Sequence, residues 1–359
     1  MAIFIFSVSV LTVLKKQVPI PGSDVATLPL LLIPVYIATM GPETVVLYFA
    51  FFISAIFYFY FYSEQYIFRN ILYIYCTFVA LQSVYALTTT FSPIPSFHTT
   101  HVRAIGGAPV SIYAFSGGKI YLHLAITVFI SSYILARYRK WPKKLFSAYI
   151  FLTGSHLFLY VLLTGTGRTG MALLFAFILF TILYVLNLNK VIPLVMISPV
   201  LLWVAGYGIY VIYPDIIFSD IFRLVNDFTS NRSLLYIGGI DIVVNNIFII
   251  REGGYTLSDL FPLPYPASLP QTTHNILINT LVDKGILVGT IFTLWLWKIG
   301  KVVSVFDVTP ENQDVMLAST IITGYLFTGL FVGGAIIFNL NNSVIWWIFL
   351  AYVLTALSS

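Results

Sequence analysis

The sequence predicts an all-α, polytopic membrane protein, and its composition supports this class. Hydrophobic residues make up 59% of the 359 residues, and charged residues only 9%. About a quarter of the residues in an average soluble domain are charged, so a water-soluble globule is excluded. The apolar residues also fall into runs long enough to cross a bilayer. Cys76 is the single cysteine, so no disulfide can form within the chain.

Eleven apolar runs, within a range of 10 to 12, are predicted to form transmembrane helices because each lies between charged or Pro- and Gly-rich breaks. They cover 1–14, 25–40, 43–62, 68–90, 119–136, 145–163, 169–186, 191–212, 275–297, 315–337 and 341–357. The first run precedes Lys15 and Lys16 and follows no positive segment, which indicates a retained anchor and not a cleaved signal. The chain is therefore predicted to be one membrane domain, 1–359.

The cations predict the orientation of these spans. Five of them lie between Arg137 and Lys144, which the positive-inside rule assigns to the cytoplasm. Alternation along the chain then places six further cations on the same side: Lys15, Lys16, Arg69, Lys190, Lys298 and Lys301. The 91–118 loop and the long 213–274 segment are predicted to lie outside. Because most basic residues are explained by the orientation of the spans in the membrane, the net charge of +5 does not indicate nucleic-acid binding.

The external face keeps an unusual share of arginine. Five of the eight arginines are predicted to lie there: Arg103, Arg168, Arg223, Arg232 and Arg251. Guanidinium groups form bidentate pairs with phosphates or carboxylates, so these arginines either bind an anionic ligand or pair with the six acids of the 213–274 segment. That segment is long enough to be functional. Its apolar stretch 234–250 and its later prolines predict a loop that lies on the membrane interface and roofs a cavity.

Three short motifs on the predicted external face are candidate site residues. The turn Gly165-Thr166-Gly167-Arg168-Thr169-Gly170 opens a span and is suited to phosphate, although a tight hairpin would explain it equally well. Asn231-Arg232-Ser233, with Arg223 upstream, opens the interfacial stretch. His274-Asn275 opens the next span, where a histidine either transfers a proton, donates to an anion or caps the helix.

The order and spacing of these motifs resemble the O-antigen polymerase and ligase superfamily of bacterial envelope glycosyltransferases. Arg232 follows Arg168 by 64 residues, His274 follows Arg232 by 42, and Asp283-Lys284-Gly285 and Gly289 come after it. The similarity covers about 164–289. One departure is the stretch 245–254, where the family has a Pro-x-x-Gly-x-Gly run; it leaves the role of Arg251 open.

The resemblance implies a GT-C-like helix bundle in the bacterial inner membrane with its active site facing the periplasm. It implies a glycosyltransferase whose catalytic residues are Arg168, Arg232 and His274. The expected substrate-binding residues are Gly167, Gly170, Arg223, Arg251, Asn275 and Tyr255, the last by stacking on a sugar. No Asp-x-Asp pair occurs, and His98 and His101 have no carboxylate nearby, so we expect neither a metal nor another cofactor.

The expected donor is an oligosaccharide linked to undecaprenyl diphosphate, and membrane lipid and a chain-length regulator protein are the other expected partners. We favour an O-antigen polymerase, which extends another lipid-linked repeat unit. The 213–274 segment has six acids and three arginines, so it offers no basic platform for phosphorylated lipid A-core, the acceptor of a ligase. Ligase activity stays an alternative. A lipid-linked oligosaccharide flippase is a more remote alternative, because a flippase would need cationic residues in a central cavity and the spans carry almost none.

Overall fold

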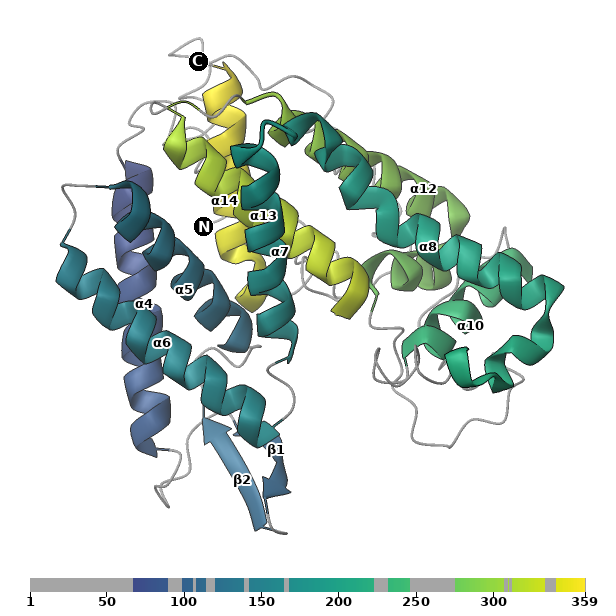
Figure 1. Ribbon diagram of the computed structural model, residues 1–359, viewed down its shortest axis with the longest axis horizontal. Coiled ribbons are helices and arrows are strands. Elements are labelled where there is room, and N and C mark those ends of the chain that lie inside the picture. The colour runs from purple at the N-terminus through teal and green to yellow at the C-terminus, as the bar shows by residue number, and fades with distance from the viewer. Residues whose placement is uncertain are drawn as a thin grey trace, which may run out of the picture.

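The computed structural model describes a bundle of helices (Figure 1). The described residues are 67–89, 99–105, 108–113, 120–138, 142–164, 168–222, 232–245, 275–306, 309, 312–332 and 340–358. Their elements are α4 (Ile67–Thr89), β1 (Thr99–Ile105), β2 (Ala108–Tyr113), α5 (Ile120–Arg137), α6 (Lys143–Thr164), α7 (Arg168–Val185), η1 (Asn189–Val191), α8 (Ile192–Ile212), η2 (Pro214–Phe218), α10 (Arg232–Asn245), α12 (Ile276–Ser304), α13 (Gln313–Val332) and α14 (Leu340–Ser358). The predicted spans 1–14, 25–40 and 43–62, with the expected anchor, lie outside this part of the chain.

The helical, membrane-spanning class is confirmed at a coarse level. Within the described residues, four helices are long and apolar enough to cross a membrane: Ile67–Tyr85, Asn189–Ile212, Gly285–Ser304 and Gln313–Phe331. Four shorter apolar helices accompany them: Tyr121–Arg137, Thr169–Val185, Leu235–Asn245 and Ile345–Ala356. The side chains of α8 that face outward are mostly aliphatic, as expected of a surface that contacts lipid tails.

The centre of the bundle is α13. In its apolar window 89% of the residues are buried, against 11% in the window of α8, so α13 is the core helix and α8 a peripheral one. It packs against α5, α7, α8, α12 and α14. The fully buried Trp346 of α14 donates from Nε1 to the Ile322 carbonyl at 3.1 Å, which ties the last helix to this core.

Hydrogen bonds group the helix ends into two sets. Tyr184, near the end of α7, donates to the Val303 carbonyl near the end of α12 at 2.7 Å, and Asn189 donates to the Ser304 carbonyl at 2.7 Å. We call this end of the bundle, predicted to be cytoplasmic, the inner end. At the other end, here the outer end, Asn275 before α12 donates to the Leu330 carbonyl near the end of α13. Helix ends that the alternating topology assigns to the same side of the membrane therefore lie at the same end of the bundle.

A β-hairpin was not predicted. β1 and β2 pair antiparallel, with Thr99 opposite Tyr113 and His101 opposite Ser111, and they pack against α6 and α4 respectively. The hairpin lies in the predicted external 91–118 loop and extends beyond the helices (Figure 1). A sequence signal was present, because Gly106-Gly107 separates two runs that contain β-branched residues.

The predicted continuous span 275–297 is wrong in its first part. Gly285 interrupts α12 with φ 81° and ψ 174°, a backbone conformation that is essentially restricted to glycine. In a straight helix Leu281 and Gly289 would be about 12 Å apart. Here a Cβ added to Gly289 would lie 3.5 Å from the Leu281 Cα, so the chain folds back sharply at the break. The membrane-crossing part is Gly285–Ser304, and residues 276–284 form a separate short helix at the outer end.

We predict that Gly285→Ala destabilises the protein by about 1–3 kcal/mol, because a side chain is strained at this φ and ψ. The melting temperature in detergent measures this. Gly208→Ala in α8 is the matched control, since nothing lies within 4 Å of its Cβ position and alanine favours a helix. An unchanged melting temperature for Gly285→Ala would show that α12 can straighten at this point.

Candidate functional site at the outer end

Each of the three predicted motifs opens a helix. Arg168 is the first residue of α7, Arg232 is the first residue of α10, and Asn275 is the N-cap of α12. The first backbone N–H groups of a helix have no partner within it, and the helix dipole is positive there. The starts of α7 and α10 therefore suit an anion, and each begins with an arginine. The start of α12 directly follows His274 in the sequence.

Several predicted site groups lie outside the described part of the structure. These are the side chains of Arg168 and Arg232 and the residues Gly167, Arg223, Arg251, Tyr255 and His274. The backbone places Arg168 and Arg232 at helix starts, and the N-cap Asn275 follows His274 directly. The positions of these helix starts are therefore known, and the geometry of the reacting side chains stays a prediction.

The outer end of α13 brings two of the motifs together. The Asn275 Nδ2 donates to the Leu330 carbonyl, and the hydroxyl of Tyr236, one turn after Arg232, donates to the Phe331 carbonyl. α10 also packs directly on α12. The starts of α10 and α12, which are 44 residues apart in sequence, are therefore held on adjacent carbonyls of one helix end.

α7, which carries the third motif, packs along the same central helix. A Cβ added to Gly324 of α13 would lie 2.4 Å from the Phe177 ring, so the two helices touch closely near their middles. α13 thus contacts all three elements that carry the predicted motifs. Sequence reasoning missed α13 as their common support, because its contacting groups are backbone carbonyls and a glycine.

Asn275 has a role other than the predicted ligand contact. Its Oδ1 accepts hydrogen bonds from the backbone N–H groups of Leu277 at 2.9 Å and Ile278 at 3.0 Å, while its Nδ2 binds the Leu330 carbonyl. The residue is buried, and these bonds satisfy both the oxygen and the nitrogen of its side-chain amide without a ligand. Asn275 fixes where α12 begins, directly after His274 in the sequence.

Gly170 also differs from its predicted role. A Cβ added to it would lie 2.7 Å from the Tyr121 carbonyl oxygen and 2.8 Å from the Leu157 Cδ1. The absence of a side chain therefore permits close packing of α7 on α5 and α6. The adjacent Thr169 is buried as well. We assign Thr169 and Gly170 to helix packing, and a contact of their backbone N–H groups with phosphate stays a prediction.

An aromatic row runs beneath this end of the bundle. The ring centroids of Phe180 and Phe327 are 5.7 Å apart, those of Phe327 and Phe331 are 5.1 Å apart, and those of Trp203 and Tyr236 are 4.3 Å apart. Trp203 also lies 6.5 Å from Phe331, so the row joins α7, α13, α8 and α10. No local sequence pattern predicted this row beyond a generally high aromatic content.

Asp241 is one of the six acids of the 213–274 segment, with which the external arginines would pair if they bind no anionic ligand. It accepts a hydrogen bond from the Tyr207 hydroxyl at 2.9 Å, which ties α10 to α8. The apolar stretch that begins at 234 was expected to lie on the membrane interface, but most of α10 is buried against α8 and α12. Within the described residues no group of three or more His, Cys, Asp or Glu is placed to hold a metal.

Comparison with known proteins adds no assignment. The chain matches no protein-family model, no curated protein and no solved structure at a significant level.

Proposed function

We propose that the protein is a membrane glycosyltransferase of the O-antigen polymerase type. The observation that carries the proposal is the support of the α10 and α12 starts by adjacent carbonyls of α13, together with the packing of α7 on the same helix. The motif residues Arg168, Arg232 and His274 belong to these three helix starts. A diphosphate needs several cationic groups and N–H donors in one place, and this arrangement supplies both.

The proposed reaction transfers a glycan from a lipid diphosphate to a sugar hydroxyl. The bond from the anomeric carbon to the diphosphate oxygen breaks, and a bond from the acceptor oxygen to that carbon forms. Arg168 and Arg232 stabilise the charge that develops on the leaving diphosphate. His274 either takes the proton of the attacking hydroxyl or holds the diphosphate while another group serves as the base.

The proposal places the reaction at the outer end of the bundle, on the periplasmic face of a bacterial inner membrane. The donor is then an oligosaccharide on undecaprenyl diphosphate, whose lipid part stays in the membrane. The half-buried aromatic side chains Trp203, Phe327 and Phe331 lie below the helix starts and offer an apolar surface for the first isoprene units.

A glycan ladder from cells without this protein tests the polymerase against the ligase. If the protein is a polymerase, its loss leaves lipid A-core with single repeat units, because a separate ligase still works. Restoring the gene should restore the ladder of longer chains. Lipid A-core that carries no repeat unit at all would identify the ligase, and an unchanged ladder would contradict both activities.

A further inference from the structure

Polar side chains recur along α4 and α5, which pack against each other, and two pairs of them meet across the interface. On α4, Cys76 and Ser83 are seven residues apart, and so are Tyr75 and Gln82; on α5, His123, Thr127 and Ser131 follow at intervals of four. These spacings place each set on one face of its helix. We call these residues the polar seam: Tyr75, Cys76, Gln82, Ser83, His123, Thr127 and Ser131. Apart from Tyr75, which is half-buried, all of them are buried.

Side-chain contacts hold the seam together across the two helices. The Tyr75 hydroxyl lies 2.9 Å from His123 Nδ1, and the Ser131 hydroxyl donates to the Cys76 sulfur at 3.9 Å. Arg69 precedes Cys76 by seven residues, and Tyr138 follows Ser131 by seven. The antiparallel packing that joins Cys76 to Ser131 therefore also places Arg69 beside Tyr138, with its guanidinium carbon 5.5 Å from the Tyr138 ring centroid.

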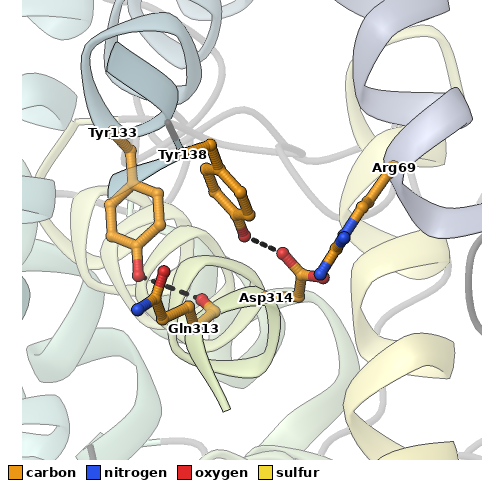
Figure 2. Close-up of polar contacts among 5 residues, drawn as sticks. All are labelled: Arg69, Tyr133, Tyr138, Gln313 and Asp314. Atoms are coloured by element: carbon orange, nitrogen blue, oxygen red, sulfur yellow. Dashed lines mark hydrogen bonds and ion pairs between the residues drawn. The ribbon is translucent and has the colours of Figure 1, made fainter. Parts of the chain in front are cut away.

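Asp314 closes the inner end of the seam. Its Oδ2 accepts a hydrogen bond from Arg69 Nε at 2.8 Å, and its Oδ1 accepts one from the Tyr138 hydroxyl. Figure 2 shows this carboxylate between Arg69 and Tyr138, with Tyr133 directed at the neighbouring Gln313, whose carbonyl it reaches at 3.0 Å. We call Arg69, Tyr138 and Asp314 the latch. The Arg69 side chain is 52% exposed and that of Asp314 11%, so the latch lies at the boundary between solvent and the bundle interior.

Two explanations fit a polar interface inside a membrane bundle. Serine, threonine and histidine can hold neighbouring helices together by hydrogen bonds. Ionisable groups within spans are costly, however, and they commonly mark paths for ions or protons. The Thr127 hydroxyl favours the second explanation, because it is fully buried and has no hydrogen-bond partner among the described residues. A buried hydroxyl in such a position is normally satisfied by an internal water molecule.

We propose that the polar seam is a path for water and protons through the bundle and that the latch holds this path closed at the inner end. In the closed state Asp314 bridges α4 and the end of α5. Separation of Arg69 and Tyr138 from Asp314 opens the seam to water from that side. Protons then pass between hydroxyl groups, the His123 imidazole and water, with no change of oxidation state. This inference does not depend on the proposed glycosyltransferase activity.

Cys76 provides a direct test of the latch, because it is the only cysteine and is fully buried. The rate of its alkylation by N-ethylmaleimide, a small reagent that crosses membranes, is measured by mass spectrometry on the full chain. We expect a slow rate for the unmodified protein and an increase of about tenfold or more for Asp314→Asn or Arg69→Ala, since local opening controls access to a buried group. Asp215→Asn, an exposed acid on η2, is the control and should stay slow.

A charge exchange separates latch opening from unfolding. The double variant Arg69→Asp, Asp314→Arg should regain slow alkylation, because the ion pair is restored with reversed charges. Equal rates in all variants would overturn the latch, and so would rapid alkylation of the unmodified protein.

Proton flux in liposomes tests the path itself. With a potassium gradient and valinomycin to set the voltage, and an internal pH-sensitive dye, Asp314→Asn should carry protons and the unmodified protein should not. Adding His123→Leu to Asp314→Asn should abolish the flux, while Cys76 stays reactive. If Asp314→Asn exposes Cys76 but carries no protons, or if the flux persists without His123, the proposed proton path is wrong.

Discussion

Replacing Arg168 or Arg232 by alanine should reduce glycan transfer by about two to three orders of magnitude, the usual effect of removing a group that stabilises a developing anion. Each residue is the first of a helix that contacts the central α13, and a helix N-terminus favours negative charge. The measurement is the rate at which purified protein elongates lipid diphosphate-linked repeat units in detergent. The assay is run in excess EDTA, because the proposed mechanism neutralises the leaving diphosphate with arginine and without a divalent ion.

Lysine should rescue either position poorly. A guanidinium can bind two diphosphate oxygens at once, whereas an ammonium acts as a point charge. Arg137→Lys is the matched control, because Arg137 is exposed at the inner end and should keep full activity. Full activity of both lysine variants at 168 and 232 would contradict the proposed diphosphate contact. Loss of activity in EDTA with recovery in magnesium would contradict the metal-free mechanism and would direct attention to loop acids such as Asp259.

Gly170→Ala should strongly destabilise the protein, by about 1–3 kcal/mol, the usual range for overpacking a close contact. The new methyl group would meet the Tyr121 carbonyl oxygen at 2.7 Å as well as the Leu157 side chain. A backbone atom cannot rotate away as a side chain can, so α7 would have to move from α5. The expected result is a lower melting temperature in detergent and less folded protein in the membrane.

Gly154→Ala is the matched control for this substitution. Its nearest neighbour is the Val128 Cγ2 at 3.8 Å, an ordinary van der Waals distance, so the change should be tolerated. The pair also distinguishes two roles of Gly170. If Gly170→Ala lowered activity while the melting temperature stayed the same, the residue would serve a close approach of substrate, as the glycine-rich turn first indicated, and the packing role assigned from the structure would be wrong.

Local composition was sufficient to predict most helices. Eight apolar runs overlap helices of the described part, namely α4, α5, α6, α7, α8, α12, α13 and α14, and each of these helices begins within two residues of its predicted start. The reason is that a chain in a bilayer must satisfy its backbone hydrogen bonds internally, so long apolar runs form helices. Arg69, Lys190 and Lys301 lie near helix ends at the inner end of the bundle, as alternation along the chain requires, and the side of the membrane that this end faces stays a prediction.

Features that depend on a partner far along the chain could not be predicted in this way. The pairing of Arg69 with Asp314 spans 245 residues, and each residue alone looked like a charge near the end of a span. Gly285 breaks α12 inside a stretch that hydropathy alone predicted as one span, because the fold back onto Leu281 needs a backbone that only glycine adopts readily.

The sequence by itself determined the class of the protein, the starts of most helices and the two arginines and one histidine that lie at three of those starts. Hydropathy and charge are local properties, and the bilayer turns them directly into helices and orientation. Only the tertiary structure decided that Asn275 and Gly170 serve capping and packing, that α13 supports the three motif helices, and that Asp314 closes the polar seam. These outcomes depend on which surfaces meet when the helices pack. The identity of one side chain does not reveal which carbonyl, ring or charged group it will contact in another helix.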